Sequence, residues 1–451
     1  MNDLGKDSVG KLLFRLSVPA ITAQIINALY NVVDRIYIGR IPDVGSAALT
    51  GVGVAFPILM IISAFSVMVG MGGAPRASIE MGRGEQDKAE KIMTNSLALL
   101  LFFGIALMSI FILARNPLLS AFGASPATLP YGSSYLGIYL LGTIFVMISI
   151  GMNSFITSQG FAKEGMATVL IGAVLNILLD PLFIFVFHMG VQGAALASVI
   201  SQGISALWAI KFLTGKKTVL HFHKKYFRPD FVIIGSILAL GISPFIMQST
   251  ESLVNIVLNT TLQRYGGDIA VGSMTILTSV VQFSLLPLSG LAQGAQPIIS
   301  YNFGAGRADR VRKAVHLLVL SGFTFATLYC LACELFPQVF VGIFTTDPEL
   351  LAAAPKYLRI YMGGTWFMGA QIACQNSFIA LGEAKISLFL ALLRKVILLI
   401  PLIYLLSSFL QTTGVFIAQP IADIIAAGTT VTIFTIQFKK IMRGMQANTA
   451  A

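Results

Sequence analysis

Four acidic residues lie inside long apolar segments of the chain, where an ionisable group is most costly: Asp34, Asp180, Glu251 and Asp423. A charged side chain at the centre of a bilayer costs about 2.5–3.5 kcal/mol on insertion scales. Such residues therefore face a bundle interior or a water-filled cavity, where they bind ions or substrates or relay protons. The alternative is a structural role, in which each carboxyl group ties two helices together through hydrogen bonds.

Two of these acids have a polar residue one helical turn before them. Tyr30 precedes Asp34 by four residues. Asn176 precedes Asp180 by the same spacing, so each pair shares one helix face. Two carboxylates in a poorly hydrated place cannot both stay ionised cheaply, so one takes up a proton or a cation lies between them. Arg35 adjoins Asp34 but points about 100° away around the helix. The spacing therefore favours a proton or Na⁺ site over an ion pair.

The composition is that of a helical membrane protein. Of the 451 residues, 56% are hydrophobic and 11% are charged, whereas soluble proteins carry about 25% charged residues. The apolar residues form twelve segments long enough to span a bilayer, at residues 16–39, 46–72, 93–114, 131–157, 165–188, 190–213, 233–262, 270–294, 313–336, 356–380, 390–409 and 414–437. This pattern excludes an ordinary soluble enzyme. The net charge of +11 has no polar domain to carry it, so we expect no nucleic-acid partner.

Lys and Arg gather on one side of the predicted membrane. They are concentrated at both termini and in the connections after even-numbered segments, and the positive-inside rule places that side in the cytoplasm. We therefore expect a multi-pass protein of the cell (inner) membrane with both termini cytoplasmic. The longest polar connector, Thr214–Asp230, contains His221 and His223. Without carboxylates or thiols nearby, these histidines are expected to be solvated rather than to bind a metal.

The sequence repeats itself once. The stretches 72–84 and 294–306 align without a gap, and each contains a glycine, a proline three positions later, and then a Gly-x-Gly loop. In nearly the same register, Pro19 matches Pro244. A duplication of six membrane segments returns the chain to the same side of the membrane. The two copies are therefore parallel and related by a pseudo-two-fold axis along the membrane normal.

The predicted fold class is an all-α integral membrane protein with twelve transmembrane helices in two parallel six-helix lobes. The predicted domains are an N-lobe at 1–213, a basic cytoplasmic linker at 214–231 and a C-lobe at 232–451.

These features resemble the multidrug and toxic compound extrusion (MATE) family of transporters. The resemblance lies in the paired glycine loops and in the run Tyr30-Asn-Val-Val-Asp34-Arg-Ile-Tyr-Ile-Gly39, which is similar to the MepA-like bacterial branch. It covers nearly the whole chain. It implies two lobes around a central cleft that opens alternately to each side, and ion-coupled export of organic, often cationic, compounds.

Matched residue by residue, the resemblance implies a cation-coupling site in the N-lobe, formed by Tyr30, Asp34, Asn153, Asn176, Asp180 and Ser198. It also matches Pro19 to the proline at which the first helix of relatives bends. Glu251 matches an acid tied to ion or substrate binding in the C-lobe. Asp423 is predicted to be the partner of Glu251 because it is also an intramembrane acid of the C-lobe. Other branches of the family use an acid in the tenth segment to bind Na⁺. Residues 361–380 of this segment contain no acid, so no Na⁺ site is expected in the C-lobe.

The sequence therefore predicts a secondary antiporter that exports organic cations and drugs in exchange for H⁺ or Na⁺. No cofactor is expected, and Na⁺ at Asp34 and Asp180 is the one candidate metal. The glycine loops lack the Gly-Lys-Ser/Thr ending of an ATP-binding loop. A lipid-linked-precursor flippase is an alternative transporter, but its cleft needs cationic residues, which are nearly absent from the interior of the N-half segments. An intramembrane transferase would need clustered acids for Mg²⁺ or histidines for acid–base chemistry. We therefore expect a transporter, monomeric in membrane lipid, rather than an enzyme.

Overall fold

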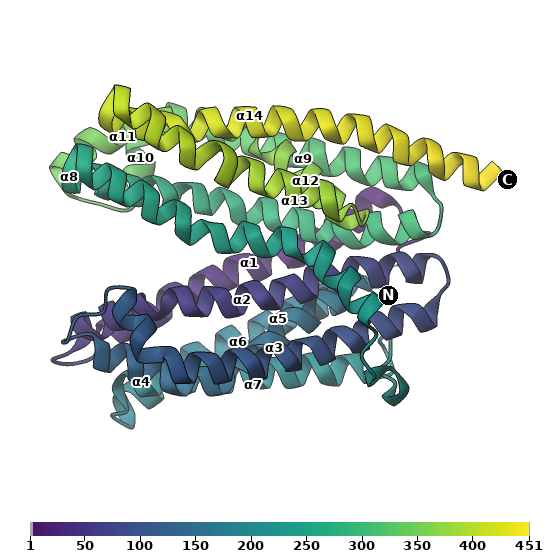
Figure 1. Ribbon diagram of the computed structural model, residues 1–451, viewed down its shortest axis with the longest axis horizontal. Coiled ribbons are helices and arrows are strands. Elements are labelled where there is room, and N and C mark those ends of the chain that lie inside the picture. The colour runs from purple at the N-terminus through teal and green to yellow at the C-terminus, as the bar shows by residue number, and fades with distance from the viewer. Residues whose placement is uncertain (1–2, 451) are drawn as a thin grey trace. The chain divides into compact units, whose positions relative to one another are not determined.

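The computed structural model describes residues 3–450, with the backbone alone for Ser252 and residues 448–450. The outermost ends of the predicted lobes, residues 1–2 and 451, lie outside this described part. Within residues 3–450 every regular element is a helix and no strand is present (Figure 1). Helices suit an apolar chain in lipid because each backbone amide is then bonded within its own segment.

The first half of the chain contains seven α-helices. They are α1 (Val9–Gly39), α2 (Gly45–Gly82), α3 (Gln86–Ala121), α4 (Leu129–Tyr139), α5 (Thr143–Ser158), α6 (Ala162–Pro181) and α7 (Gly190–Leu213). The 3₁₀ turn η1 (Leu140–Gly142) joins α4 to α5, and the π-helical stretch η2 (Leu182–Val186) extends α6. The linker that follows contains the 3₁₀ turn η3 (Lys224–Phe227).

The second half also contains seven α-helices. They are α8 (Phe231–Gly304), α9 (Ala308–Leu335), α10 (Pro337–Gly342), α11 (Pro348–Met362), α12 (Met368–Ala380), α13 (Ala384–Leu392) and α14 (Ile400–Ala450). The 3₁₀ turn η4 (Thr365–Phe367) lies between α11 and α12, and the π-helical stretch η5 (Leu393–Leu399) lies between α13 and α14.

Nine helices of the described chain are long and apolar enough to cross a membrane. Two of them contain one non-helical residue, Gly267 (φ 60°) in α8 and Gln411 (φ 52°) in α14. Both positions fall between segments that the sequence predicts as separate. Glycine adopts a positive φ at little cost because it has no Cβ atom. The fold is therefore all-helical, with nine to twelve apolar helices depending on how these interruptions and η4 are counted.

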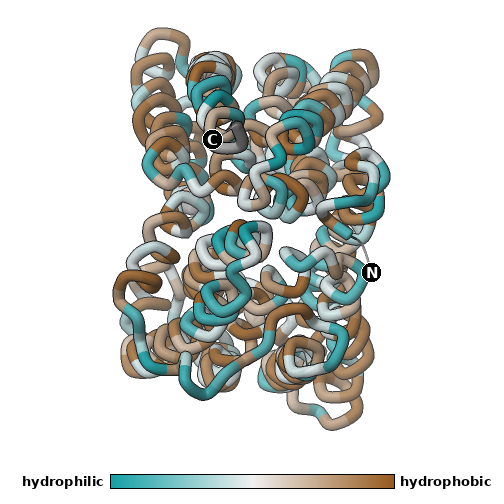
Figure 2. The backbone as a smooth tube through the Cα atoms, turned by 90° about the vertical axis from the view of Figure 1, so that its right-hand side faces the viewer, coloured by the Kyte–Doolittle hydropathy of each residue, from teal (hydrophilic) through white to brown (hydrophobic). Residues whose placement is uncertain are grey.

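The outer surfaces of the helices are apolar. Many helical turns are hydrophobic, and hydrophilic residues are visible at the helix ends and connections that face the viewer in the end-on view of Figure 2. Large side chains such as Leu113 (85% exposed) and Phe409 (77% exposed) have no protein cover. Exposed apolar surface on this scale is unfavourable in water and is solvated by lipid tails. The helices are thus built to lie in a membrane.

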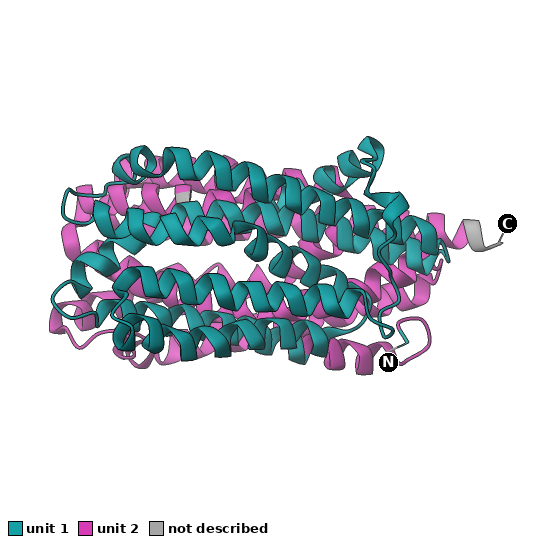
Figure 3. Ribbon diagram, turned by 90° about the horizontal axis from the view of Figure 1, so that it is seen from below, with its two compact units in different colours: residues 1–3, 18–245 teal, residues 4–17, 246–451 magenta. Residues whose placement is uncertain are grey.

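The chain forms two compact units (Figure 3). Among the described residues, unit 1 contains residues 3 and 18–245, and unit 2 contains residues 4–17 and 246–450. The first helix of each repeat is divided between the units. Helix α1 passes from unit 2 to unit 1 after Ser17, two residues before Pro19, and α8 passes from unit 1 to unit 2 after Phe245, one residue past Pro244.

Glycines at equivalent positions of the two repeats allow close packing against the beginnings of α1 and α8. In unit 1, a Cβ on Gly72 would come 2.1 Å from the carbonyl oxygen of Ile237, so α2 and the start of α8 are in backbone contact. In unit 2, a Cβ on Gly294 would come 2.5 Å from the backbone nitrogen of Ser17. These two glycines are equivalent positions of the repeat, since each precedes the shared proline by three positions. In each repeat, a glycine therefore allows close backbone contact with the beginning of the other repeat's first helix.

The start of α3 holds the linker in unit 1. Lys91 Nζ lies 2.7 Å from Asp230 Oδ2, and the Asn95 side chain bonds the backbone of both Tyr226 and Asp230. In unit 2 the end of α8, the turn after it and the start of α9 hold the N-terminal segment. The Asn302 amide donates to the Leu4 carbonyl at 2.9 Å. The Arg310 guanidinium donates to the carbonyls of Leu4 and Asp7. The Arg307 guanidinium donates to the Gly5 carbonyl.

The premise that no carboxylate lies near the linker histidines is wrong, although the His221 and His223 side chains remain 46% and 45% exposed. The Glu90 carboxylate lies beside the two linker histidines, 2.8 Å from His223 Nε2, and accepts a hydrogen bond from the His221 backbone N–H at 3.1 Å. A carboxylate is therefore close to both residues, brought there by folding of the linker onto α3. Three His, Cys, Asp or Glu side chains do not come together in metal-binding geometry anywhere in the described residues.

Candidate functional site

The two acids of unit 1 lie against each other. Asp34 projects from α1, and Asp180 occupies the last turn of α6, immediately before Pro181 and the π-helical η2. The two carboxyl groups interact directly. Asp180 is fully buried. One oxygen of each, Asp34 Oδ1 and Asp180 Oδ2, is sealed from solvent and has no hydrogen-bond partner among the described residues. An acid pair with orphaned oxygens is a place for a proton or a small cation.

Three other predicted residues join this acid pair. Asn176 Nδ2 donates to Asp180 Oδ1 and to Ser198 Oγ, both at 3.3 Å. Its own carbonyl oxygen, Asn176 Oδ1, is buried without a described partner. Tyr30 lies close enough to both carboxyl groups to interact with them. Helices α1, α6 and α7 therefore meet at one small polar centre.

Asn153 is not part of this centre. Its Oδ1 atom lies beside Gly165 at the start of α6, where a Cβ on that glycine would be 3.1 Å away. Asn176 follows Gly165 by eleven residues on the same helix, which at 1.5 Å per residue is about 16 Å. The structure thus separates Asn153 from the five other predicted members of the site. Asn153 lies on the neighbouring helix α5, away from the acid pair.

Three residues of the centre were missed by sequence analysis. Tyr135 reaches Ser198, and Tyr139 interacts with Asp34, while Gln202 reaches the Tyr30 hydroxyl. The Tyr135 and Tyr139 rings stack at 5.7 Å. Their spacing of four residues on α4 was a usable signal, since it places both rings on one helix face. These tyrosines enclose the acids with apolar rings and weakly acidic hydroxyls, which limits access of water.

Among the described residues, no basic side chain forms an ion pair with Asp34 or Asp180, although the charge of Arg35 acts on Asp34 from a distance. The Arg35 guanidinium lies over the Phe56 ring, 4.9 Å from its centre, and forms no ion pair with Asp34 in the described structure. This agrees with its position about 100° around the helix. The orphaned oxygens of Asp34, Asp180 and Asn176 are hard ligands of the kind that alkali and alkaline-earth cations prefer. The residues present therefore fit a proton or Na⁺.

The two acids of unit 2 are arranged differently. Glu251 pairs with Lys395, whose Nζ also donates to the Met247 carbonyl at 3.0 Å. Asp423 pairs with Arg394, with Nε to Oδ1 at 2.8 Å. The expectation that Asp423 is the direct partner of Glu251 is wrong, because each acid has a base of its own. The two pairs remain neighbours, since Tyr361 interacts with both acids.

The two bases of this cluster lie next to each other in η5 (Leu393–Leu399). The wider turn of a π-helix is frequent at functional sites. Here Arg394 reaches α14 and Lys395 reaches α8. Sequence analysis concentrated on intramembrane acids and missed these bases as site residues. The signal was present, because a base inside an apolar segment is as costly as an acid.

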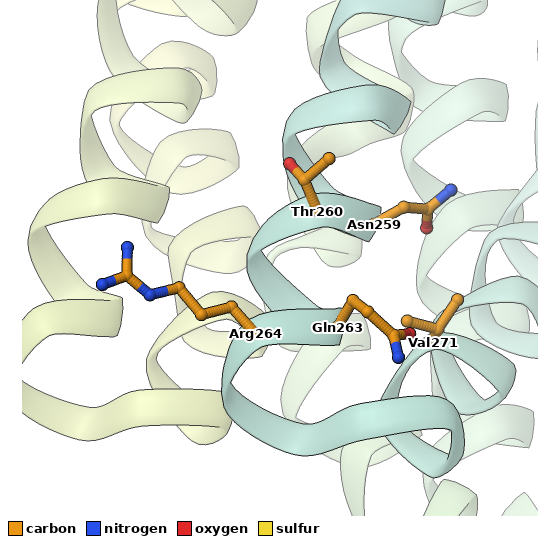
Figure 4. A pocket seen from close by; sticks show the side chains of 5 residues that line it. All are labelled: Asn259, Thr260, Gln263, Arg264 and Val271. Atoms are coloured by element: carbon orange, nitrogen blue, oxygen red, sulfur yellow. The ribbon is translucent and has the colours of Figure 1, made fainter. Parts of the chain in front are cut away.

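Unit 2 lacks a counterpart of the acid pair. When the first helices of the two repeats are aligned on their prolines, Asp34 corresponds to Asn259. When the repeats are aligned on their glycine loops, Asp180 corresponds to Leu402. Asn259 instead lines an open cavity of about 520 Å³ together with Thr260, Gln263, Arg264 and Val271 (Figure 4). The Arg264 side chain extends away from Asn259 in that view. None of these five described lining residues is a carboxylate.

Comparisons with known proteins agree with the internal duplication. The MatE family profile matches twice, at residues 19–182 and 244–405. The multidrug export protein MepA of Staphylococcus haemolyticus is 26% identical over 422 residues, which is 94% of this chain and 92% of that protein. MepA of Staphylococcus aureus is 27% identical over 426 residues, with the same coverage of both chains.

Solved structures share the fold. A MOP superfamily transporter from Pyrococcus furiosus superposes with a TM-score of 0.90 at 22% identity, covering 97% of this chain and 98% of that one. A MATE structure in the bent conformation superposes with a TM-score of 0.92 at 22% identity, covering 98% of both chains. The two matches to the MatE profile cover well over half of the sequence, and the chain is therefore a member of the MatE family of multi-pass membrane transporters and not an enzyme.

Proposed function

We propose that this protein is a secondary antiporter of the cell membrane that exports organic cations and drugs by alternating access, in exchange for H⁺ or Na⁺. In this proposal twelve membrane segments form an N-lobe (1–213) and a C-lobe (232–451) around a linker (214–231), with both termini cytoplasmic, and the monomer suffices. The observation that carries the proposal is the Asp34–Asp180 pair, which is buried and has no basic partner among the described residues.

Such a pair can couple an ion to a drug because its charge depends on its occupancy. When it is empty, two carboxylates repel each other and favour a state in which water or a cationic drug screens them. When a proton or Na⁺ binds, the repulsion is relieved and a tighter arrangement of α1 and α6 is favoured. Ion and drug then stabilise different states of the same helices, as reciprocal coupling requires.

Pro19 is the proposed hinge of this change. Proline cannot donate the backbone hydrogen bond that continues a helix, so α1 bends there more easily than elsewhere. The division of α1 between the compact units after Ser17, just before the proline, supports this role. The N-terminal segment is held by Asn302 and Arg310 in unit 2, so a bend at Pro19 would move Asp34 relative to that anchor.

The proposed cycle follows from these parts. In the outward-facing state an ion reaches the acid pair, α1 bends at Pro19, and the drug is released outward. In the inward-facing state the ion leaves down its gradient. The acids then recharge and restore the affinity for the drug. Glu251 and Asp423 are proposed to take part in substrate recognition rather than ion coupling, because each already carries a basic partner.

A flippase for lipid-linked precursors is less well supported. Its cleft would need positive charge in excess to attract a pyrophosphate. The two bases of η5, Arg394 and Lys395, are each matched by an acid, so this cluster has no net charge.

Reconstitution tests the proposed function. The purified protein in liposomes would be loaded with a fluorescent organic cation and given either a pH gradient or a Na⁺ gradient, with the membrane potential held at zero by K⁺ and valinomycin. We expect one of the two gradients to drive uphill transport, and protein-free liposomes to show none. Transport that neither gradient drives would refute the antiport proposal.

A further inference from the structure

We propose that the interface between α6 and α7 in unit 1 is a proton path, which leads from the Asp34–Asp180 pair to the end of the unit where α6 begins and α7 ends. The inference rests on the antiport function proposed above, and it names the proton as the coupling ion and gives its route of release. The proposed orientation of the membrane segments places that end in the cytoplasm.

Buried hydroxyl groups follow α7 away from the acid pair. Ser198 accepts a hydrogen bond from Asn176, which belongs to the polar centre around the acids. Ser201 and Ser205 follow at spacings of three and four residues, so the three hydroxyls share one face of α7. Each of these serines is at most 6% exposed. The face packs on α6, because Ser205 Oγ donates to the Thr168 carbonyl at 3.0 Å.

Polar groups also continue along the facing side of α6. A Cβ on Gly172 would come 2.6 Å from Ser205 Oγ, so the serine hydroxyl occupies the space that a larger residue would fill. One turn earlier, the Thr168 hydroxyl donates to the Glu164 carbonyl at 3.2 Å. Glu164 is the acid of the first turn of α6. From Asn176 to this acid the helix rises about 18 Å at 1.5 Å per residue.

Three polar atoms of these two helices are sealed from solvent without a hydrogen-bond partner among the described residues. They are Asn176 Oδ1, Ser201 Oγ and Trp208 Nε1. A buried serine that only packs can bond the carbonyl one turn earlier, as Ser66 does with Ile62 at 2.9 Å, and Ser201 makes no such bond. Ordered water is the usual partner of a buried polar group that no protein group satisfies. These atoms therefore predict internal water along the interface.

The other side of the acid pair is apolar. Ile38 follows Asp34 by one turn on α1, and Ile184 follows Asp180 by one turn in η2. Both isoleucines belong to one buried hydrophobic cluster with Val191, and none of the three is more than 5% exposed. An unpaired charge is strongly disfavoured in such surroundings. Within unit 1, the polar interface therefore leads from the pair toward the start of α6.

A chain of hydroxyls and water molecules suits a proton better than a metal ion. A hydroxyl can accept a proton from one neighbour as it gives its own to the next, so no group is consumed. The first step runs through water at the Asn176 carbonyl oxygen, because an amide keeps its protons. The proton ends on cytoplasmic water, and the acid pair regains its negative charge. A metal cation needs several oxygen ligands at each step, for which the close packing of Gly172 on Ser205 leaves no room.

Two substitutions of the same shape test this path. Ser201→Val and Ser201→Thr differ by one hydroxyl, so their effects on packing cancel in the comparison. The purified full-length variants would be placed in liposomes with trapped pyranine, a pH-sensitive dye, and proton flux driven by an ethidium gradient would be recorded. Tracer exchange of radiolabelled ethidium, at equal ethidium concentration and equal pH on both sides, measures movement of the drug-loaded protein without net proton transfer.

We expect proton flux in Ser201→Val to be at least about tenfold slower than in Ser201→Thr, which corresponds to one hydrogen bond to the moving charge. Tracer exchange should be the same in both variants. Trp208→Phe removes the orphaned donor and keeps an aromatic ring, so it should also slow proton flux without slowing exchange. Ser66→Ala removes a satisfied buried hydroxyl on another helix of unit 1 and should change neither rate.

The outcomes separate this inference from the antiport proposal. Equal proton flux in Ser201→Val and Ser201→Thr, or a loss of flux and exchange together in Ser201→Val alone, would overturn the proton path and leave the antiport function standing. A wild type that a Na⁺ gradient drives and a pH gradient does not would have the same meaning. A wild type that neither gradient drives would refute the antiport function itself, and the path with it.

Discussion

Replacing either acid of the unit 1 pair by asparagine should uncouple export from the ion gradient. Asparagine keeps the shape of aspartate but cannot take up and release a charge. Asp180 is fully buried, and its Oδ1 atom accepts a hydrogen bond from Asn176 that an asparagine carbonyl can also accept. Asp180→Asn should therefore preserve packing while it removes one titrating site. Asp34→Asn acts in the same way from α1.

The magnitude follows from the number of coupling groups. One pH unit is worth about 1.4 kcal/mol per proton, a factor of ten in a concentration ratio. The site contains two acids, Asp34 and Asp180, so at most two ions are exchanged in each cycle. With the membrane potential held at zero and a gradient of one pH unit, the wild type should sustain a drug ratio of about 10 for one proton or about 100 for two. A fully uncoupled variant should equilibrate at a ratio of about 1.

The assay is the steady-state distribution of a fluorescent cation in liposomes, under a pH gradient and under a Na⁺ gradient of equal size. Asp268→Asn, which changes an exposed acid outside the site, is the matched control and should keep the wild-type ratio. Dye binding in detergent should survive in both site variants, while release on addition of the ion should disappear. A site variant that still pumps uphill with a normal ion response would refute the unit 1 site and direct attention to Glu251 and Asp423.

Four other results are expected. A cysteine at the exposed Lys217 position of the linker should react with an impermeant maleimide only in inverted vesicles, and labelling of intact cells would overturn the orientation. Glu251→Gln should lower transport while the protein stays folded, and wild-type transport of every substrate would leave it a packing residue. Pro19→Ala should slow export without changing cation affinity, whereas an unchanged rate would exclude the hinge. The hydrogen bond from Lys91 lowers the pKa of Asp230 below its usual value, so this acid stabilises the folded linker above pH about 4 and loses that effect on further acidification. Thermal stability should therefore fall more between pH 5 and pH 3 in the wild type than in Asp230→Asn, and parallel curves would contradict this.

The fold was largely predictable because the membrane limits the choices. An apolar chain in lipid must form helices, and the lengths of the apolar segments give their bounds. The duplication was visible because the glycines at 72 and 294 are required where two backbones touch. The division of α1 and α8 between the units was not predictable. This division depends on which segment, distant in sequence, each helix end packs against. Hydropathy does not predict that contact.

The site was predictable along one helix but less so between helices. The spacing of four residues correctly grouped Tyr30 with Asp34 and Asn176 with Asp180, since a helix fixes that geometry. Asn153 shows the limit of matching by resemblance, because a sequence match does not fix the height of a side chain relative to residues on other helices. The partners of Glu251 and Asp423 were missed for a related reason. Their bases come from η5, where a π-helical turn changes the direction of successive side chains.

The two repeats have diverged in charge, and the difference bears on how transport can be coupled. Where unit 1 has Asp34 and Asp180 without a base, unit 2 has Asn259 and an apolar residue. Where unit 2 has Arg394 and Lys395, alignment on the glycine loops leads to Gly172 and Ala173 in unit 1, and Gly172 is packed against Ser205. Two identical acid sites would compete for the same ion and give neither lobe a preference for substrate. If the antiport proposal holds, the acid pair of unit 1 takes the ion and the neutralised cluster of unit 2 is left for the substrate. Helices α1 and α8 each contribute to both units. Coupling then requires only that the occupied ion site favours one conformation of these helices and the occupied substrate site favours the other.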